Sequence, residues 1–192
     1  MVDVARQARP VNPRYELRVA TMADLPALQA LIATSVRGLS AGFYAAAQIE
    51  AAITEVFGVD TQLIADGTYY VIDGASGPVA VGGWGLRRTL YGGDQLKGEE
   101  DPILNPKTDP ARIRAFFVHP AHARRGLARR LYNECARAAH AAGFRGLELM
   151  STLPGEPLYA ALGFSPVERI ALPLPGGVEL PLIRMARRID SA

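Results

Sequence analysis

The residues with the clearest chemical potential are four arginines that gather at the start of one helix. Arg124 and Arg125 lie in a short loop after an apolar strand, and Arg129 and Arg130 follow in the first turns of a helix that begins near Gly126. Cations there are unfavourable by roughly a few tenths of a kcal/mol each, because a helix N-terminus already carries partial positive charge. A phosphate or pyrophosphate relieves the conflict, since free backbone N–H groups and arginine forks both bind it. The spacing therefore indicates a phosphate site.

Small residues in the same loop support this interpretation. Gly126 lets the backbone approach a ligand closely, and Ala128 keeps the next turn small. The alternative is an arginine-rich, solvated helix in an arginine-rich chain, since only Lys97 and Lys107 among the 21 basic residues are lysines. A nucleic-acid module that uses the arginines is disfavoured by the net charge of +2 and by the few aromatic residues beside them.

The segments around this loop resemble the GNAT N-acetyltransferase superfamily. The phosphate loop of that family, Q/R-x-x-G-x-G/A, follows a strand and opens a helix. It aligns on residues 123–128, with Ala123 in place of the usual Gln or Arg. Val-His-Pro at 118–120 and Leu-Tyr-Ala-Ala-Leu-Gly-Phe at 158–164 match the strand end and the Y-x-x-x-G-F element of the family. Order and spacing fit over residues 113–164.

Hydrophobic periodicity and turn residues predict the elements that position these motifs. The first part of the chain predicts a strand at 15–20, a helix from Leu25 after the capping box Thr21–Asp24, a helix over 45–57, a hairpin over 68–73 and 79–87, and a polar connection over 89–110. The second part predicts a strand at 113–118, a helix that ends at Gly143, a strand at 147–150, a short helix that ends at Gly163, and closing strands over 167–174 and 178–186. The helix before Gly143 carries an apolar stripe of Leu127, Leu131, Cys135, Ala138 and Ala142. This order predicts a mixed α/β sheet. The resemblance implies a GNAT-like α/β (α+β) fold: a mostly antiparallel sheet of about six to seven strands, helices on both faces, and a splay between two central parallel strands.

The resemblance also implies acetyl-CoA as co-substrate, with no metal ion. The pantetheine arm would pair with the strand at 116–118 like an added strand, and the pyrophosphate would lie on residues 124–130. The implied cofactor-binding residues are Phe116, Phe117, Val118, Arg124, Arg125, Gly126, Leu127, Ala128, Arg129, Arg130 and Thr152. Thr152 stands where the family often has an asparagine, and the neighbouring Ser151 is an alternative.

Acetyl transfer to an amine by direct attack in a ternary complex needs a proton acceptor for the ammonium group and a proton donor for the departing sulfur. Tyr159 in the Y-x-x-x-G-F element is the expected catalytic acid, with a packed core aromatic as its alternative. The general base stays open between Glu148, Glu156 and a water relay. Cys135 lies on the apolar stripe of its helix, which argues against a covalent acyl-cysteine.

The acceptor is an amine on a small molecule or a peptide, which the sequence does not identify further. Trp84 and Tyr91 are the candidate acceptor-binding residues, with core or dimer contacts as the alternative. The acidic stretch over 94–101 is compatible with a cationic acceptor. A polyamine, an antibiotic, an amino acid and a protein N-terminus all remain open. A catalytically weak acyl-CoA sensor is the alternative function.

Length and composition limit the number of domains, the metal and disulfide chemistry and the partners that we expect. The 192 residues suit a single domain over 15–190 behind a flexible arm over 1–14. One cysteine makes no internal disulfide, and one cysteine with three histidines argues against a zinc site. The sequence has no apolar run of the ~18–20 residues that a membrane span needs. We therefore expect a cytoplasmic protein without a membrane or nucleic-acid partner, and leave a homodimer open.

Overall fold

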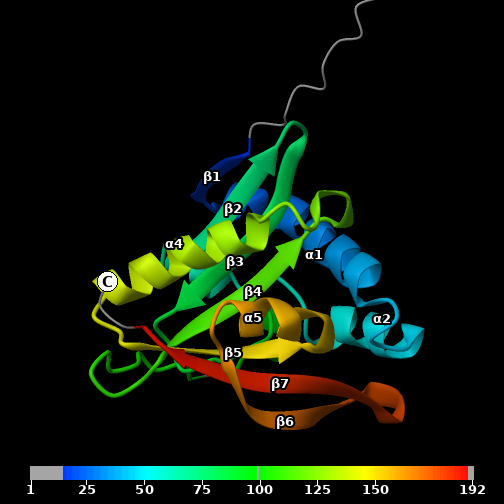
Figure 1. Ribbon diagram of the computed structural model, residues 1–192. Helices are drawn as coiled ribbons and strands as arrows, with labels where there is room; N and C mark the ends of the chain where they lie inside the picture. Colours follow the sequence, from blue (N-terminus) through cyan, green and yellow to red (C-terminus); the bar gives the residue numbers. More distant parts are fainter. Residues whose placement is uncertain (1–14, 99, 190–192) are drawn as a thin grey trace, which may run out of the picture.

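A single sheet forms the centre of the molecule (Figure 1). The computed structural model describes residues 15–98 and 100–189, and over these residues the sheet has seven strands. The strands are β1 Glu16–Val19, β2 Tyr69–Gly74, β3 Gly77–Gly85, β4 Ala111–Val118, β5 Gly146–Thr152, β6 Ser165–Leu174 and β7 Val178–Arg188. The helices are α1 Leu25–Ser40, α2 Ala46–Glu55, α3 Thr61–Ala65, α4 Leu127–Ala141 and α5 Glu156–Ala161. The expected arm over 1–14 lies outside the described residues.

The strands lie in the order β1-β2-β3-β4-β5-β7-β6. Neighbouring strands are antiparallel except β4 and β5, which are parallel. This arrangement confirms the expected mixed, mostly antiparallel sheet with one central parallel pair. The short helix α3 has no counterpart among the sequence expectations; the Asp60 side chain caps it by accepting a hydrogen bond from the Gln62 N–H.

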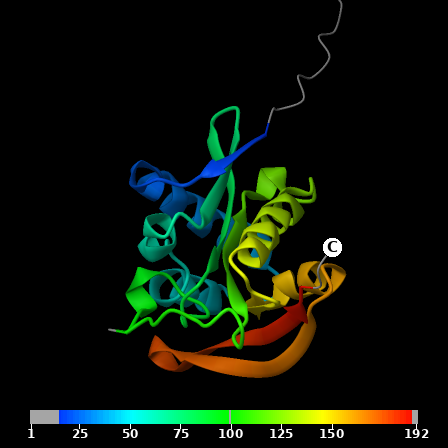
Figure 2. The same ribbon diagram turned by 90° about the vertical axis from the view of Figure 1, so that its left-hand side faces the viewer.

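Helices cover both faces of the sheet (Figure 2). α1, α2 and α3 lie on one face, which we call the α1 face, and α4 and α5 lie on the other, the α4 face. Alternation along the strands divides the core between them, because successive side chains of a strand point to opposite faces. Leu147 and Leu149 of β5 pack with α4, whereas Leu180 and Leu182 of β7 pack with α1 and α2.

The two central parallel strands separate along their length, as the resemblance implied. Pairing between β4 and β5 is limited to Ala111 with Leu147 and Arg112 with Glu148. Beyond Arg112, β4 pairs only with β3, and an irregularity lies in this part of the strand. Its cause is Ala115, whose φ of 53° is in the left-handed region, so that one extra residue stands between the partners of Val81 and Gly83. One edge of β4 therefore faces away from any strand over residues 113–118.

Helix α4 begins and ends as its sequence predicts, but its buried stripe differs in detail. Gly143 follows the helix with a φ of 96°, which glycine adopts without strain. Ala139 is fully buried, whereas Ala138 is only partly buried and Ala142 is exposed. The expected end of the stripe was therefore wrong. With 3.6 residues per turn, a step of four from Cys135 leads to Ala139 and stays on the buried face.

The long connection over 89–110 is fixed against the sheet by a buried arginine of β4. The Arg114 guanidinium donates to Asp60 Oδ2 at 2.8 Å, to the Thr89 carbonyl oxygen at 2.8 Å and to the Gly92 carbonyl oxygen at 2.7 Å. Arg114 and Asp60 are both almost completely buried and form an ion pair, and the other carboxylate oxygen of Asp60 pairs with Lys97. This contact places Tyr91 beside β4.

Candidate active site

The loop between β4 and α4 places four arginines around the start of the helix. A short turn over Pro120–His122 follows β4, and Arg124 and Gly126 then take positive φ values of 62° and 79°. Gly126 is the residue before the first turn of α4, whose first N–H groups have no partner within the helix. A Cβ atom at Gly126 would meet no atom within 4 Å, so the space beside this backbone is open. The helix start can therefore receive an anion.

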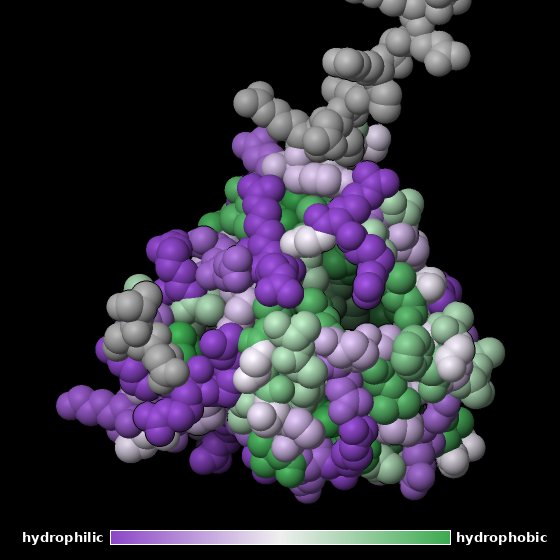
Figure 3. Space-filling model, in the orientation of Figure 1, coloured by the Kyte–Doolittle hydropathy of each residue, from purple (hydrophilic) through white to green (hydrophobic). Residues whose placement is uncertain are grey.

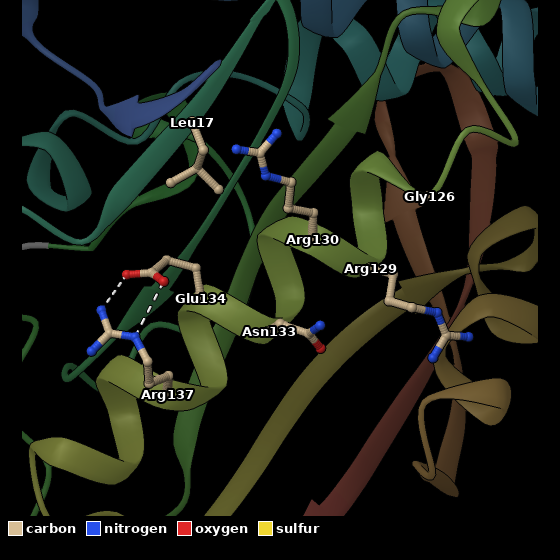
Figure 4. A pocket seen from close by; sticks show the side chains of 7 residues that line it. All are labelled: Leu17, Gly126, Arg129, Arg130, Asn133, Glu134 and Arg137. Atoms are coloured by element: carbon tan, nitrogen blue, oxygen red, sulfur yellow. Dashed lines mark hydrogen bonds and ion pairs between the residues drawn. The ribbon is translucent and has the colours of Figure 1, made fainter. Parts of the chain in front are cut away.

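The side chains of these arginines point in different directions. Arg125 donates to the Tyr15 hydroxyl at 3.2 Å, and Arg130 donates to the Tyr15 carbonyl oxygen at 2.9 Å, so both reach toward the N-terminal edge of the sheet. Arg129 points the opposite way, toward the side of β5 (Figure 4). A groove of about 550 Å³ runs along this part of α4. It is lined by Leu17, Gly126, Arg129, Arg130, Asn133, Glu134 and Arg137.

The other expected residues of the loop have structural roles. Leu127 is buried beneath the helix and anchors its first turn in the core, whereas Ala128 is partly buried. His122 stacks edge-on against Tyr15, and its Nδ1 lies 3.0 Å from the Tyr15 hydroxyl. Burial and the nearby Arg125 charge lower the pKa of His122. The shift favours the neutral form of the ring beside the arginines.

The open edge of β4 forms one wall of a cleft between β4 and β5. We define this cleft, the β4–β5 cleft, by Phe116, Phe117 and Val118 on β4 and by Met150 and Thr152 on β5. β4 and β5 diverge toward their C-terminal ends (Figure 1), and the space-filling view in the same orientation shows a hollow with hydrophobic walls there, next to a cluster of hydrophilic side chains (Figure 3). The apolar walls and a backbone edge that no strand covers together suit an extended, amide-bearing chain.

The two phenylalanines of β4 point to opposite faces. Phe116 covers Gly82 on the α4 face, where a Cβ atom at residue 82 would lie 2.4 Å from the Phe116 ring. Phe117 packs edge-on against Phe57 on the α1 face, with 5.9 Å between ring centroids. The Val118 N–H donates to Ser35 Oγ of α1 at 3.1 Å. Ser35 is a site residue that its sequence context, inside an ordinary amphipathic helix, does not reveal.

Tyr159 lies on the α4 face of the cleft. Its ring packs against Phe116 and Phe164, with centroid separations of 6.4 and 5.8 Å. Burial raises the pKa of the Tyr159 hydroxyl, which therefore stays protonated at neutral and mildly alkaline pH. Its oxygen makes no hydrogen bond to the described residues 15–98 and 100–189. The phenol is thus held in place by packing and keeps a proton to donate.

Gly155 brings the expected polar residues of β5 close to Tyr159. A Cβ atom at Gly155 would lie 2.9 Å from Ser151 Oγ, 3.2 Å from Thr152 Oγ1 and 3.3 Å from the Tyr159 ring. The Ser151 hydroxyl donates to the Thr152 carbonyl oxygen at 2.8 Å, whereas Thr152 is only partly buried. Thr152 is therefore the more accessible of the two hydroxyl groups at this end of the cleft.

The two candidate acceptor-binding residues lie on different sides of the sheet. Trp84 is buried in the core of the α4 face against Phe144, as its alternative interpretation expected, so we leave it out of the acceptor site. Tyr91 is partly buried on the α1 face, in the same cluster as Phe117 and Met150. Of the two candidates, only Tyr91 is thus partly exposed, and it lies on the α1 face.

The acidic residues proposed for catalysis or for a cationic acceptor are engaged in structural contacts. Glu148 pairs with two arginines, and Glu156 pairs with Arg169 at 2.6 Å. Asp94 and Asp101 accept backbone hydrogen bonds of 3.0 and 2.7 Å from Thr61 and Thr89, respectively. The geometry therefore singles out no carboxylate as a general base, and proton removal through water stays a hypothesis.

Cys135 is expected to be inert. It is fully buried in α4, and burial raises the pKa of its thiol well above the usual value, so no reactive thiolate forms. We expect Cys135→Ala to retain turnover and to lower the free energy of unfolding by about 1 kcal/mol. A thiol reagent should label the native protein only after denaturant is added. Loss of turnover in a folded Cys135→Ala variant would restore the cysteine to the mechanism.

Two features are absent from the residues that the structure describes. None of their helices is both long and apolar enough to cross a bilayer. They also contain no group of three or more His, Cys, Asp or Glu side chains placed to hold a metal ion.

A family model described as an acetyltransferase (GNAT) domain matches residues 65–166, which is more than half of the chain. The protein therefore belongs to the GNAT acetyltransferase family. The match covers β4, the loop before α4 and the segment with Tyr159, so the resemblance that those motifs carry is confirmed. A search of curated proteins found no match.

Solved structures share the fold over nearly the whole chain. A GCN5-related N-acetyltransferase from Rhodopseudomonas palustris is 19% identical, with a TM-score of 0.67, and the alignment covers 95% of this chain and 100% of that one. The PaiA N-acetyltransferase of Thermoplasma acidophilum, solved with coenzyme A, is 14% identical over 92% and 99% of the two chains, with a TM-score of 0.64. YncA of Salmonella typhimurium, solved with its cofactor acetyl-CoA, is 17% identical over 93% and 95%, with a TM-score of 0.60. At these identities the likeness shows the GNAT fold.

Proposed function

We propose that the protein is an N-acetyltransferase that moves the acetyl group of acetyl-CoA to an amine on a small molecule or peptide. One observation carries this proposal: an open strand edge leads from an anion-receiving helix start to a buried, protonated tyrosine. Membership of an acetyltransferase family favours this activity over the acyl-CoA sensor. The two neighbours solved with coenzyme A or acetyl-CoA support the choice of donor.

The cleft fits the parts of acetyl-CoA in order. The pyrophosphate would accept hydrogen bonds from the free N–H groups at Gly126 and the first turn of α4, with Arg129 beside it. The pantetheine arm would lie along residues 116–118 of β4, whose outer edge no strand covers. Phe116, Phe117 and Thr152 would line its path. The thioester would then lie close to the Tyr159 ring, which packs against Phe116.

In this proposal the amine attacks on one face of the cleft and the sulfur is protonated on the other. The amine approaches from the α1 face, past Tyr91 and Phe117, and its nitrogen forms a bond to the thioester carbon. The C–S bond breaks as the carbonyl is restored, and the sulfur takes a proton from the Tyr159 hydroxyl on the α4 face. The ammonium group gives one proton to water before the attack, and the second proton that the nitrogen loses as the amide forms returns to the Tyr159 oxygen through water. No covalent acyl-enzyme is required, in keeping with the buried Cys135.

An assay with a panel of amines tests this function. We expect release of the coenzyme A thiol from acetyl-CoA that depends on the amine, together with an acetylated amine of 42 Da greater mass, roughly the mass of one acetyl group replacing hydrogen. Primary amines of different charge are needed, because the acceptor class is open at this stage. If the protein binds acetyl-CoA but none of the amines accelerates release of the coenzyme A thiol, the protein is a sensor instead.

The two arginines of the first turns of α4 are expected to differ in their effect. Arg129 points toward β5 and lies free for the pyrophosphate, whereas Arg130 is engaged with the Tyr15 carbonyl oxygen. We expect Arg129→Ala to weaken acetyl-CoA binding about fivefold, since a solvent-screened contact to an anion is worth about 1 kcal/mol. Arg130→Ala should weaken it less. Titration calorimetry with both variants measures the difference, and a larger loss in Arg130→Ala would place the pyrophosphate on the other side of α4.

A further inference from the structure

Two hydroxyl groups hold the ends of the strands that border the β4–β5 cleft. Ser35 Oγ of α1 accepts a hydrogen bond of 3.1 Å from the N–H of Val118, the last residue of β4. The Tyr44 hydroxyl, between α1 and α2, accepts one of 2.9 Å from the N–H of Leu153, the residue directly after β5. Ser35 and Tyr44 are both buried. The two diverging strands are therefore fastened at their C-terminal ends to one piece of chain, residues 35–44, which we call the spacer segment.

The helix that contributes to the spacer segment lies across the C-terminal ends of both strands. α1 contacts the turn over 120–122, which follows β4, and the turn over 153–155, which follows β5. At Gly38 the helix lies so close to Pro120 that a Cβ atom would have no room. Figure 1 shows α1 and α2 beside the ends at which β4 and β5 diverge. The distance between these two ends thus depends on contacts that the spacer segment makes.

On the β5 side, the Tyr44 hydroxyl lies between two strands of the sheet. It accepts from the Leu153 N–H and donates to the Pro181 carbonyl oxygen of β7 at 2.7 Å. The pairing of β5 with β7 ends one position earlier, at Thr152 with Leu182, so Leu153 and Pro181 would form the next pair of the antiparallel register. The hydroxyl therefore connects the two groups that this next pair would join.

The alternation of the ladder shows what the hydroxyl replaces. At the other end of the β5–β7 pairing, the Ile189 N–H donates to the carbonyl oxygen of Arg145, which stands opposite it. Hydrogen-bonded pairs recur at every second position of an antiparallel ladder, so residues 153 and 181 occupy a bonded position as well. A direct bond would bring the Leu153 nitrogen to about 2.9 Å from the Pro181 oxygen. The inserted hydroxyl keeps them further apart, and β5 leaves the sheet here.

The segment that Tyr44 holds leads directly to the proposed acid. The turn Leu153–Gly155 is followed at once by α5, on which Tyr159 lies. A Cβ atom at Gly155 would lie 3.3 Å from the Tyr159 ring, so the turn and the phenol are close neighbours. Burial raises the pKa of the Tyr44 hydroxyl, which therefore keeps the proton that it donates to Pro181. A shift of the turn toward β7 would carry the Tyr159 ring with it.

We propose that Ser35 and Tyr44 are positioning residues for acetyl transfer, whose hydroxyl groups set the separation at which acetyl-CoA on β4 meets Tyr159 on α5. This inference rests on the proposed function and adds residues that act through β4 and Tyr159, away from the reacting atoms. A misplacement of about 1 Å in a catalytic constellation costs up to roughly a hundredfold in rate. Hydroxyl groups outside the cleft therefore affect kcat by holding its two walls.

A double-mutant cycle between Tyr44 and Tyr159 tests this inference. Tyr44→Phe retains the ring and removes both hydrogen bonds. With the amine of the panel that gives the fastest thiol release, we expect kcat to fall about tenfold, within the range for misplaced catalytic groups. Acetyl-CoA affinity should change little, because β4 and the start of α4 bind the co-substrate. In the Tyr159→Phe background, where no acid remains to be placed, Tyr44→Phe should lower kcat by less than about twofold.

Ser35→Ala tests the β4 side in the same way and provides a second variant should Tyr44→Phe unfold. It removes the acceptor of the Val118 N–H, and its loss of kcat should likewise shrink in the Tyr159→Phe background. The midpoint of thermal unfolding, measured for every variant, shows which of them are folded. A purely structural effect would lower stability and kcat by the same amount whether or not the Tyr159 hydroxyl is present.

Gln48→Met is the matched control. Gln48 lies just beyond the spacer segment and also ties this part of the chain to β7, since its Nε2 donates to the Glu179 carbonyl oxygen at 2.6 Å. Its Oε1 accepts from the Ala45 N–H at 2.8 Å. Both partners lie away from the ends of β4 and β5, so this variant should retain the wild-type kcat.

The outcomes separate this inference from the proposed function. Unchanged kcat in folded Tyr44→Phe, a loss of the same factor in both backgrounds, or an equal loss in Gln48→Met would overturn the positioning role. Amine-dependent thiol release by the wild-type protein would still uphold acetyl transfer in each of these cases. A wild-type protein that releases no thiol with any amine would contradict the proposed function and the inference together.

Discussion

Replacement of Gly126 by valine is expected to weaken acetyl-CoA binding by about a hundredfold. Gly126 has a φ of 79° at the start of α4, and the space beside its Cα is open. A branched side chain would fill this space and separate the backbone N–H groups from the pyrophosphate. Loss of one or two charge-assisted hydrogen bonds of about 1.5–3 kcal/mol each accounts for the magnitude. Titration calorimetry with acetyl-CoA measures it directly.

Gly143→Val provides the control for backbone strain. Gly143 lies just beyond the opposite end of α4 with a φ of 96°, and a Cβ atom there meets only Pro106, at 3.5 Å. Both variants place a branched residue in the left-handed region, so both should unfold more easily by roughly 1–2 kcal/mol. Only Gly126→Val should lose affinity. If Gly126→Val binds acetyl-CoA as Gly143→Val does, the pyrophosphate lies elsewhere.

Replacement of Tyr159 by phenylalanine is expected to lower kcat about a hundredfold and to leave acetyl-CoA affinity nearly unchanged. General acid catalysis contributes roughly 10²–10⁴-fold, and a thiolate leaves readily enough to favour the lower end. The variant retains the packing against Phe116 and Phe164, so its unfolding midpoint should stay close to that of the wild-type protein. Steady-state kinetics at saturating acetyl-CoA measures the loss of kcat.

A second buried tyrosine serves as the control for this variant. Tyr132 packs against the same Phe164, with 5.9 Å between ring centroids, but its hydroxyl accepts a hydrogen bond from Arg187 away from the cleft. Tyr132→Phe should retain turnover. Because burial raises the pKa of Tyr159, its proton loss should cause no decline of kcat below about pH 10, the ordinary pKa of tyrosine. Full turnover of folded Tyr159→Phe would remove this residue from the mechanism.

The sequence predicts the order of the elements well, because each carries its own local signal. The apolar strand before Pro120 and the glycines at 143 and 163 lie where they are expected, and the stripe of α4 does so as far as Cys135. Separation of β4 and β5 followed only from the resemblance. The irregularity between β3 and β4, which the left-handed conformation of Ala115 causes, has no local signal, because alanine ordinarily avoids this region.

The site is less predictable than the fold, since its polar contacts join distant parts of the chain. Ser35 reaches the Val118 N–H across 83 positions, and Glu148 joins β4 to β7. For Trp84, the residue type suggested a contact with the acceptor. The alternation of side chains along β3 instead places Trp84 in the core beneath α4. Whether a strand residue faces the acceptor or the core depends on register, and a single irregularity changes it.

Amide hydrogen exchange with and without coenzyme A tests the central claim most directly. The account places the ligand along the open edge of β4 and on the first turn of α4. It predicts slower exchange at residues 115–118 and 126–129 when coenzyme A is added, with little change in the strands β1, β2 and β6. Slower exchange confined to other parts of the chain, while residues 115–118 and 126–129 exchange as in the free protein, would contradict it.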